Sequence, residues 1–355
     1  MGLIKKEINL NKNLKIVVIK TDGIGDAILA TPFLFELRKI FKKAHITGIL
    51  SPQGKEVLDL LNIFDEIKVI EPKWLGYKKV SFLIRWLYAL KLLFLINKVK
   101  ADIAFALRWQ DRITSFILSV CNAKKKVGYD VKGMGFRIDL KAKNENIHTI
   151  YKNLNLLKLI QPEMKYKIKL GFSVSEEAEN SIKKFLIKNK IKNYIVIHPV
   201  SGHPSKDWGI DNFFLLAERL SKKYKILIIG AKTDKNIEKI RGKNILNVAG
   251  TFSIKETGCL IKNSLMVIGG DSSAGHIAAV FKKKSLILFS GAALFENWAP
   301  FNKNCFIVTR NVKCRGCELI NCNKNHDCMN FKDDFIFDLV KKILSGKQKN
   351  KIIKV

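Results

Sequence analysis

Short apolar runs alternate with amphipathic stretches along the first half of the chain. The β-branched run at 15–19 is followed by a glycine-containing loop and then by a helical pattern at 27–42. Strands are predicted at 15–19, 46–50, 66–70 and 103–107. Helix-forming segments separate them, which is typical of a parallel sheet covered by helices on both faces. Thr31-Pro32 is also a good helix start, so the beginning of this helix stays open.

The second half repeats this alternation after a basic connector at 164–170. Its strands are predicted at 194–198, 225–229, 265–268 and 285–290. Its helices are predicted from near Ser175, at 211–221, 253–262 and 272–281. Both halves therefore have the pattern of a doubly wound α/β fold.

Three segments follow from this pattern. We expect two Rossmann-like α/β domains, 1–165 and 166–330, which face each other across a cleft. The remaining segment, 331–355, contains a helical pattern at 333–344 and is expected to pack back across the domains. Open parallel sheets bind ligands at the carboxyl ends of their strands, so the cleft is the expected site.

The composition excludes several classes of protein. With 355 residues of which 47% are hydrophobic, the chain is neither a small disulfide scaffold nor a polar disordered chain. Its 64 Lys and Arg against 31 Asp and Glu give a net charge of +33. This excess indicates either a Lys-rich solvated surface or an anionic partner, and the even scatter of the lysines leaves both interpretations open.

The cysteines and the N-terminus indicate a reducing compartment. Residues 1–14 contain no apolar signal-peptide core, so we expect a cytoplasmic protein. Seven cysteines are then expected as thiols or ligands. The spacing of Cys314, Cys317, Cys322 and Cys328 allows a structural zinc site, with free loop thiols as the alternative.

The segment 74–100 is aromatic and basic. Its most apolar part, 82–96, is interrupted by Arg85 and Lys91 and is too short to cross a bilayer of about 30 Å. It is either an amphipathic helix packed on the first domain or an element that lies on a membrane surface. In the second case, the basic run 124–126 and other basic residues of the first domain are expected to help it meet anionic head groups or acceptor phosphates.

The loop after the first predicted strand, residues 21–26, has the sequence TDGIGD. Gly23 and Gly25 permit positive φ and a close approach of ligand to backbone, and Asp26 is expected at the helix start with its carboxylate toward the cleft. The alternative is an ordinary turn in which Asp26 only caps the helix. Neither a dinucleotide fingerprint nor a P-loop pattern is present.

A second candidate loop follows the strand at 194–198. Ser201 and nearby amides are placed to contact phosphate oxygens, and Lys206 supplies a compact positive charge. The alternative is that Lys206 is one surface lysine among many. Its place near Trp208 at a helix entrance favours a binding role.

The third candidate segment, 269–276, has the sequence GGDSSAGH between a strand and a helix. Small residues at a helix N-terminus expose amide donors to which a diphosphate can bind. The alternative is a helix capped by Ser272 or Ser273, with His276 half-buried.

Together these segments resemble glycosyltransferase family 9, the ADP-heptose:lipopolysaccharide heptosyltransferases. The G-I-G-D loop, the H-P-x-S-G…K-x-W segment and the G-D-S-x-x-x-H helix start occur in the order and spacing of that family, over residues 15–344. The resemblance implies a GT-B architecture, with an N-terminal domain for a lipid-linked acceptor and a C-terminal domain for a nucleotide sugar.

The resemblance also implies roles for individual residues. Asp26 corresponds to the general base, with Gly23 and Gly25 on the acceptor side. Lys206 and Ser272 correspond to groups that hold the donor diphosphate, and Asp234 lies near the nucleoside. The full set of implied donor-binding residues is Ser201, Lys206, Asp234, Asp271, Ser272, Ser273 and His276. Many family members have a glycine where this chain has Ser273.

The chemistry agrees with these roles. Inverting sugar transfer needs a base on the acceptor side and stabilisation of the departing diphosphate on the other. The chain has no Asp-x-Asp pair, which many metal-dependent transferases use, so we expect metal-independent catalysis without a cofactor.

The resemblance implies three partners: ADP-heptose, a lipid-linked oligosaccharide acceptor, and the anionic inner face of the cytoplasmic membrane. One alternative is a related transferase that uses another nucleotide sugar. Another is a basic nucleic-acid-binding protein, which no recognised binding motif supports, so no nucleic-acid partner is expected.

Overall fold

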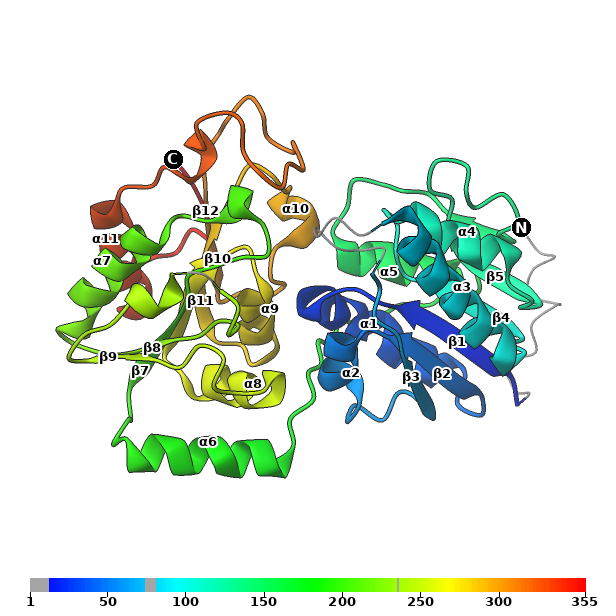
Figure 1. The fold of residues 1–355 in the computed structure, drawn as a ribbon, viewed down its shortest axis with the longest axis horizontal. Helices are drawn as coiled ribbons and strands as arrows, with labels where there is room; N and C mark the ends of the chain where they lie inside the picture. Colours follow the sequence, from blue (N-terminus) through cyan, green and yellow to red (C-terminus); the bar gives the residue numbers. More distant parts are fainter. Residues whose placement is uncertain (1–12, 74–80, 235) are drawn as a thin grey trace. The chain divides into compact units, whose positions relative to one another are not determined.

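The computed structural model describes residues 13–73, 81–234 and 236–355. Residues 1–12, where we expect no export signal, and residues 74–80 of the predicted helix 74–100 lie outside this description. The chain forms two compact units, Met1–Ser173 and Val174–Val355 (Figure 1). The first unit therefore extends beyond the predicted boundary at residue 165.

The first unit is a parallel α/β sheet with strand order β3-β2-β1-β4-β5-β6. Its elements are β1 (Lys15–Lys20), α1 (Ile24–Ile40), β2 (His45–Leu50), α2 (Pro52–Leu58), β3 (Glu66–Val69), α3 (Phe82–Val99), β4 (Ile103–Ala106), α4 (Arg112–Val120), β5 (Lys125–Tyr129), β6 (Leu140–Ala142) and α5 (Thr149–Lys158). Helix α1 contacts α2 and α5, whereas α3 contacts α4. Val17 and Ile19 of β1 enter the apolar core formed with α3 and α4.

The second unit has a parallel sheet with strand order β13-β12-β11-β10-β7-β8-β9. Its main elements are α6 (Glu176–Lys188), β7 (Tyr194–His198), α7 (Ile210–Ser221), β8 (Lys225–Ile228), β9 (Ile245–Asn247), α8 (Ile254–Asn263), β10 (Met266–Gly270), α9 (Ser273–Val280), β11 (Lys284–Phe289), α10 (Phe295–Trp298), β12 (Cys305–Thr309), α11 (Asp333–Leu344) and β13 (Ile352–Lys354). Three short 3-10 turns complete it: η2 (Pro204–Lys206), η3 (Ile237–Lys239) and η4 (Asp327–Met329). The prediction of two doubly wound α/β domains is confirmed.

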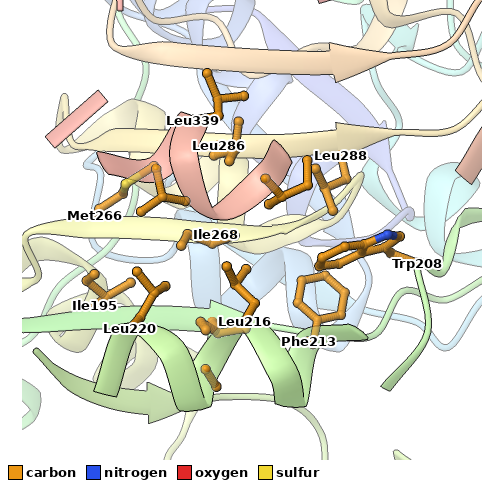
Figure 2. Packing of buried hydrophobic residues seen from close by; sticks show 14 of the residues in the cluster. Ile195, Trp208, Phe213, Leu216, Leu220, Met266, Ile268, Leu286, Leu288 and Leu339 are labelled. Carbon is orange, nitrogen blue, oxygen red and sulfur yellow. The ribbon is translucent and has the colours of Figure 1, made fainter. Parts of the chain in front are cut away.

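The core of the second unit lies between its sheet and helices α7 and α11. Phe213, Leu216 and Leu220 of α7 pack with residues of β7 and β10, and Leu339 of α11 joins the same cluster (Figure 2). Trp208 packs edge-on against Phe213, with ring centroids 5.0 Å apart.

The C-terminal segment, which we expected to pack back across the domains, belongs to the second unit. Ile336, Leu339, Val340 and Ile343 recur at helical spacing, and all four are buried in the second-unit core. Strand β13 then pairs with β12 and extends the sheet. The apolar face of α11 therefore packs against the core of the second unit.

Helix α1 begins at Ile24, earlier than the predicted start at residue 27, and Pro32 lies inside it. A proline has no N–H to donate to the carbonyl four residues earlier, here that of Ile28. The Thr31 hydroxyl donates to this carbonyl at 2.7 Å instead. Thr31 Oγ1 also accepts the Gly171 N–H at 2.9 Å, which ties the connector to the first unit.

Candidate functional site

The strand order gives each unit one topological switch point, which is the pair of neighbouring strands from which later strands are added toward opposite edges of the sheet. In the first unit it lies between β1 and β4, and in the second between β7 and β10. The strands of each pair are parallel, so their carboxyl ends lie at the same edge of the sheet. Ligands of open α/β sheets bind at such an edge, beside the switch point.

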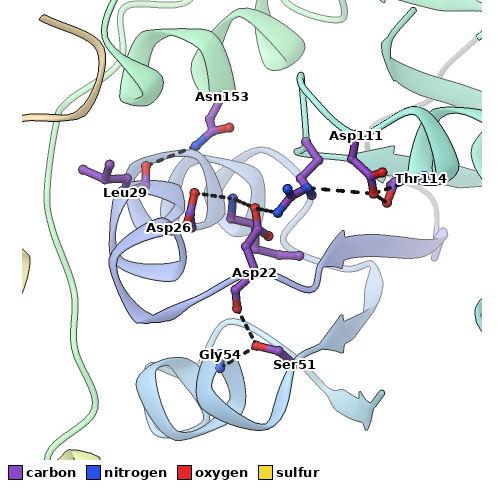
Figure 3. Close-up of polar contacts among 10 residues, drawn as sticks. Asp22, Asp26, Leu29, Ser51, Gly54, Asp111, Thr114 and Asn153 are labelled. Atoms are coloured by element: carbon purple, nitrogen blue, oxygen red, sulfur yellow. Dashed lines mark hydrogen bonds and ion pairs between the residues drawn. The ribbon is translucent and has the colours of Figure 1, made fainter. Parts of the chain in front are cut away.

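Charged side chains gather at the switch point of the first unit. Lys20, the last residue of β1, is only 2% exposed, and its Nζ lies 3.1 Å from Asp22 Oδ2 and 3.9 Å from Asp26 Oδ1. Arg108, which follows β4, places Nη1 2.9 Å from Asp22 Oδ2 and Nε 3.8 Å from Asp111 Oδ2. Figure 3 shows these contacts. We call these five residues the charged cluster.

The charges of the cluster support one another. Burial opposes ionisation of Asp22, but Lys20 and Arg108 outweigh it and hold the pKa of this carboxyl below its ordinary value. Burial likewise disfavours the charged form of Arg108, yet Asp22, Asp26 and Asp111 raise its pKa above the ordinary value. Both shifts favour the charged forms of Asp22 and Arg108 at neutral pH.

Asp26 is the more accessible carboxylate beside the buried contacts of Asp22 with Lys20 and Arg108. Its side chain is 31% exposed, against 5% for Asp22. It lies in the first turn of α1, where the helix dipole favours a negative charge. The N-cap is Gly23 and not Asp26, so the interpretation of Asp26 as a simple cap is wrong.

The two predicted acceptor-side glycines do not use the conformation that we expected. Gly23 has φ −77° and Gly25 lies within α1, so neither adopts positive φ. A Cβ added to Gly23 would meet no atom within 4 Å. The open backbone at Gly23 leaves space beside the first turn of α1, which is the remaining basis for an acceptor-side role.

Lys20, Asp22, Arg108 and Asp111 were not predicted as members of the site. Lys20 directly follows the predicted strand 15–19, and Arg108 and Asp111 are distant from it in the chain. The signal that could have found them is position: each follows or ends a strand that borders the switch point. Pairing of β1 with β4 brings them together.

In the second unit, Lys206 and Asp271 form an ion pair at the switch point. Lys206 lies in η2 after β7, and Asp271 follows β10. Their Nζ and Oδ2 atoms are 2.5 Å apart, with the Lys206 side chain 19% exposed. The two loops predicted as phosphate-binding segments are thus brought together.

Ser272 is the N-cap of α9, but its side chain makes no capping hydrogen bond. Its Oγ lies 2.8 Å from Nδ1 of His198, the last residue of β7. Burial lowers the pKa of His198 to about 4, so the imidazole is neutral and Nδ1 can accept the hydroxyl proton. The N–H groups at the start of α9 are consequently not satisfied by a side-chain cap, which is the arrangement that binds anions.

Gly269 allows β10 to approach β7 closely. A Cβ at this position would lie 2.6 Å from the His198 carbonyl oxygen. The neighbouring Gly270 faces the Lys206 carbonyl oxygen, 3.3 Å from a built Cβ. These contacts explain why glycines precede Asp271.

The other predicted donor residues lie in or near these loops. The Ser201 hydroxyl lies 2.9 Å from Asp207 Oδ1 and 2.7 Å from the His203 carbonyl oxygen, so it shapes its own loop. Asp234 accepts the Ala231 N–H at 2.6 Å after β8. Ser273 and His276 lie in α9, the first half-buried and the second buried.

The four clustered cysteines occupy one loop of the second unit. Burial is the main cause that raises the pKa of Cys328, and Cys322, Cys314 and Cys317 raise it further. Within the described ranges, no group of three or more His, Cys, Asp or Glu side chains is arranged to hold a metal ion. The structural zinc site stays a prediction.

Helix α3 has the apolar character predicted for 82–96. Among the residues that the structure describes, no helix combines the length and hydropathy required to cross a membrane. In the basic run 124–126, Lys126 is buried and donates to the Ser119 carbonyl at 2.8 Å. The expectation that the whole run meets head groups is therefore wrong for Lys126.

Comparison with known proteins decides the family. The profile of glycosyltransferase family 9 (heptosyltransferase) matches residues 93–326, about two thirds of the chain. The chain belongs to glycosyltransferase family 9. It is therefore a glycosyltransferase, as predicted. Gly23, Gly25 and Asp26 lie before the matched residues of this family 9 member.

Curated relatives extend over nearly the whole chain. Lipooligosaccharide heptosyltransferase 2 of Campylobacter jejuni is 25% identical over 351 residues, which cover 93% of this chain and 99% of the relative. Lipopolysaccharide heptosyltransferase 3 of Escherichia coli K12 is 25% identical over 298 residues, covering 79% and 83%.

Solved structures confirm the fold of this family 9 enzyme. A family 9 glycosyltransferase from Veillonella parvula has a TM-score of 0.75 at 18% identity and covers 95% of this chain and 100% of its own. The E. coli ADP-heptose lps heptosyltransferase II has a TM-score of 0.72 at 14% identity, with 94% and 99% covered. The predicted GT-B fold class is confirmed.

Proposed function

We propose that this enzyme transfers a heptose from ADP-heptose to the oligosaccharide of a lipid-linked acceptor, with inversion at the anomeric carbon. Family membership gives the reaction class, and the names of the curated relatives support the sugar and the acceptor. The observation that carries the proposal is the position of Lys206 beside a helix start that lacks a side-chain cap.

The second unit has the groups needed to bind a donor diphosphate. In the proposed complex, phosphate oxygens replace Asp271 as partner of Lys206 and accept hydrogen bonds from N–H groups at the start of α9. These groups stabilise the charge that develops on the diphosphate as the bond to the anomeric carbon breaks. Because Lys206 and α9 provide positive charge, we propose that no divalent metal is required.

The first unit has the group needed to activate an acceptor. In our proposal Asp26 removes the proton of the acceptor hydroxyl while its oxygen forms the new bond to the anomeric carbon. The diphosphate leaves with the electron pair of the broken bond. Lys20, 3.9 Å from Asp26 Oδ1, restrains the carboxylate from its buried side.

Transfer assays with several donors test this function. The enzyme is incubated with a truncated lipooligosaccharide core and ADP-heptose, ADP-glucose or UDP-glucose, with and without EDTA. The mass of the lipid product is then measured by mass spectrometry. We expect one added heptose from ADP-heptose alone, unchanged by EDTA. Product from another donor only would indicate a related transferase, and loss of product in EDTA would contradict metal independence.

A lipid-linked acceptor also requires contact with a membrane, which we propose takes place at the cytoplasmic face through α3. Leu83, Leu87, Leu90 and Phe94 lie along one side of this helix, and each is more than half exposed. The opposite side, at Ala89, Leu92 and Ile96, is buried in the first-unit core. The helix contains no acidic residue, and Lys91 and Lys98 are exposed. Exposed apolar residues with flanking lysines suit an anionic lipid surface.

Flotation with lipid vesicles tests this surface. We expect wild-type enzyme to float with vesicles that contain anionic phosphatidylglycerol, and the double variant Leu87→Ser, Leu90→Ser to remain unbound. Ile187→Ser is the matched control, because Ile187 is 67% exposed on α6 of the second unit. Equal flotation of wild type and the double variant would exclude α3 as the contact.

A further inference from the structure

Lys206 lies in a short turn that is held by contacts with a distant segment. Turn η2 has three residues, and hydrogen bonds within a 3-10 turn have poorer geometry than those of an α-helix, so contacts from outside add to its stability. Ser205, which precedes Lys206, is 2% exposed and bonds through all its polar groups to one distant segment. Its N–H donates to the Ile320 carbonyl at 3.0 Å, and its hydroxyl donates to the Leu319 carbonyl at 2.5 Å. Its carbonyl accepts from His326 Nε2 at 2.8 Å.

The segment that holds Ser205 is itself firmly attached. We call residues 314–328, which carry the four clustered cysteines, the cysteine loop. Near its start, the Gly316 N–H donates to the Gly291 carbonyl at 2.6 Å, after β11. Near its end, Arg310 Nη1 donates to the Asp327 carbonyl at 3.0 Å. The loop thus connects the carboxyl ends of β11 and β12 with η2.

The contacts on Ser205 differ in kind from the contact on Lys206. The Lys206 ammonium pairs with Asp271, a side chain that an anionic ligand can replace. The bonds between Ser205 and the cysteine loop involve the N–H, the carbonyl and the hydroxyl of Ser205, and they do not occupy the Lys206 ammonium. They can therefore persist when the partner of Lys206 changes.

We propose that the cysteine loop positions Lys206 for the donor diphosphate, and that His326 is the positioning residue that does so through the Ser205 carbonyl. The inference rests on the proposed donor-binding role of Lys206. It means that a cysteine-rich loop outside the three binding segments affects donor affinity through Lys206.

Calorimetric titration with ADP, together with donor and acceptor kinetics, tests the inference. His326→Leu removes the donor to Ser205, whereas His326→Gln retains an N–H at the end of the side chain. We expect His326→Leu to weaken ADP binding about 2- to 10-fold, the usual range for one hydrogen bond, and to raise the donor KM with the acceptor KM unchanged. His326→Gln should restore most of the affinity. Asn323→Leu, exposed in the same loop, is the control and should bind ADP as wild type does.

A double-mutant cycle separates positioning from a general effect on the loop. In a Lys206→Met background, His326→Leu should produce no further loss of ADP affinity, because its effect passes through Lys206. An equal loss in both backgrounds would overturn the inference. If Lys206→Met weakens ADP binding and His326→Leu does not, only the inference fails. If Lys206→Met has no effect, the proposed donor site itself fails. Ser205→Ala, which removes the bond to Leu319, provides the same test should His326→Leu not fold.

Discussion

The two units share a strand order but use their switch points differently. In the first, two cations with little or moderate exposure are surrounded by three carboxylates, and one of these, Asp26, remains partly accessible. In the second, one half-buried lysine is paired with one carboxylate beside a helix start without a side-chain cap. The first arrangement suits a fixed carboxylate that accepts a proton, and the second suits reversible binding of an anion. The same topology thus carries a mainly anionic cluster in one unit and a lysine beside a helix start in the other, which are the groups that our proposal uses for the acceptor and the donor.

The largest effect should come from Asp26. Asp26→Asn keeps the shape of the side chain but removes the base, so we expect transfer to fall about 10²- to 10⁴-fold. ADP affinity and the melting temperature should stay at wild-type values, because the proposed donor site lies in the second unit. Steady-state kinetics and ADP titration check both parts. Turnover close to that of the wild type would contradict the proposed role of Asp26 as the base in the first unit.

Asp22 should matter for stability more than for chemistry. Asp22→Asn leaves Lys20 and Arg108 without their shared carboxylate, and removal of one partner from a buried pair costs about 3 kcal/mol in free energy of unfolding. The pKa of Asp22 is lowered in the folded state, so its contribution is present above about pH 3.9 and is lost as the pH falls through the lower folded value.

Urea unfolding at pH 7 and at progressively lower pH measures this difference. The gap between wild type and Asp22→Asn should be full at pH 7 and shrink in acid. Glu163→Gln, exposed in the same unit, should show no gap. A constant gap across this range would mean that packing, and not charge, determines the effect.

Lys206→Met should weaken ADP binding about 10-fold or more, since hydrogen bonds to charged groups contribute about 1.5–3 kcal/mol. The acceptor KM should not change. Lys222→Met, exposed in the second unit, is the matched control for loss of one charge in this basic chain. Similar losses in both variants would indicate a diffuse electrostatic effect and not a defined donor site.

The smallest effect concerns His198. Its pKa is lowered to about 4 by burial, so the unfolded chain binds a proton near pH 6.5 when the folded chain does not. Stability of the second unit should therefore be highest above about pH 6.5 and decline as the pH falls toward 4. Thermal melts of wild type and His198→Asn should show a weaker decline in the variant. Parallel declines would assign the pH dependence to other groups.

Much of the site could be predicted because loops after strands carry distinctive residues. The segments containing Asp26, Lys206 and Asp271 were recognised from glycines, prolines and small residues beside apolar runs. The sequence does not show that β1 pairs with β4, so the contact of Arg108 with Asp22 was not predicted. The predicted start of α1 at residue 27 was three residues late, because the glycines before Asp26 are typical of a loop, whereas the helix already begins at Ile24.

Thr31 makes two distant parts of the first unit interdependent. Its proton goes to a carbonyl that Pro32 leaves open, and its oxygen receives the amide of Gly171, the last glycine before the chain enters the second unit. A single hydroxyl thus satisfies the open carbonyl of the helix that bears Asp26 and also holds the segment that leads to the second unit. Valine at this position would fill the same space yet release both attachments together, so natural variation there should be confined to serine or threonine.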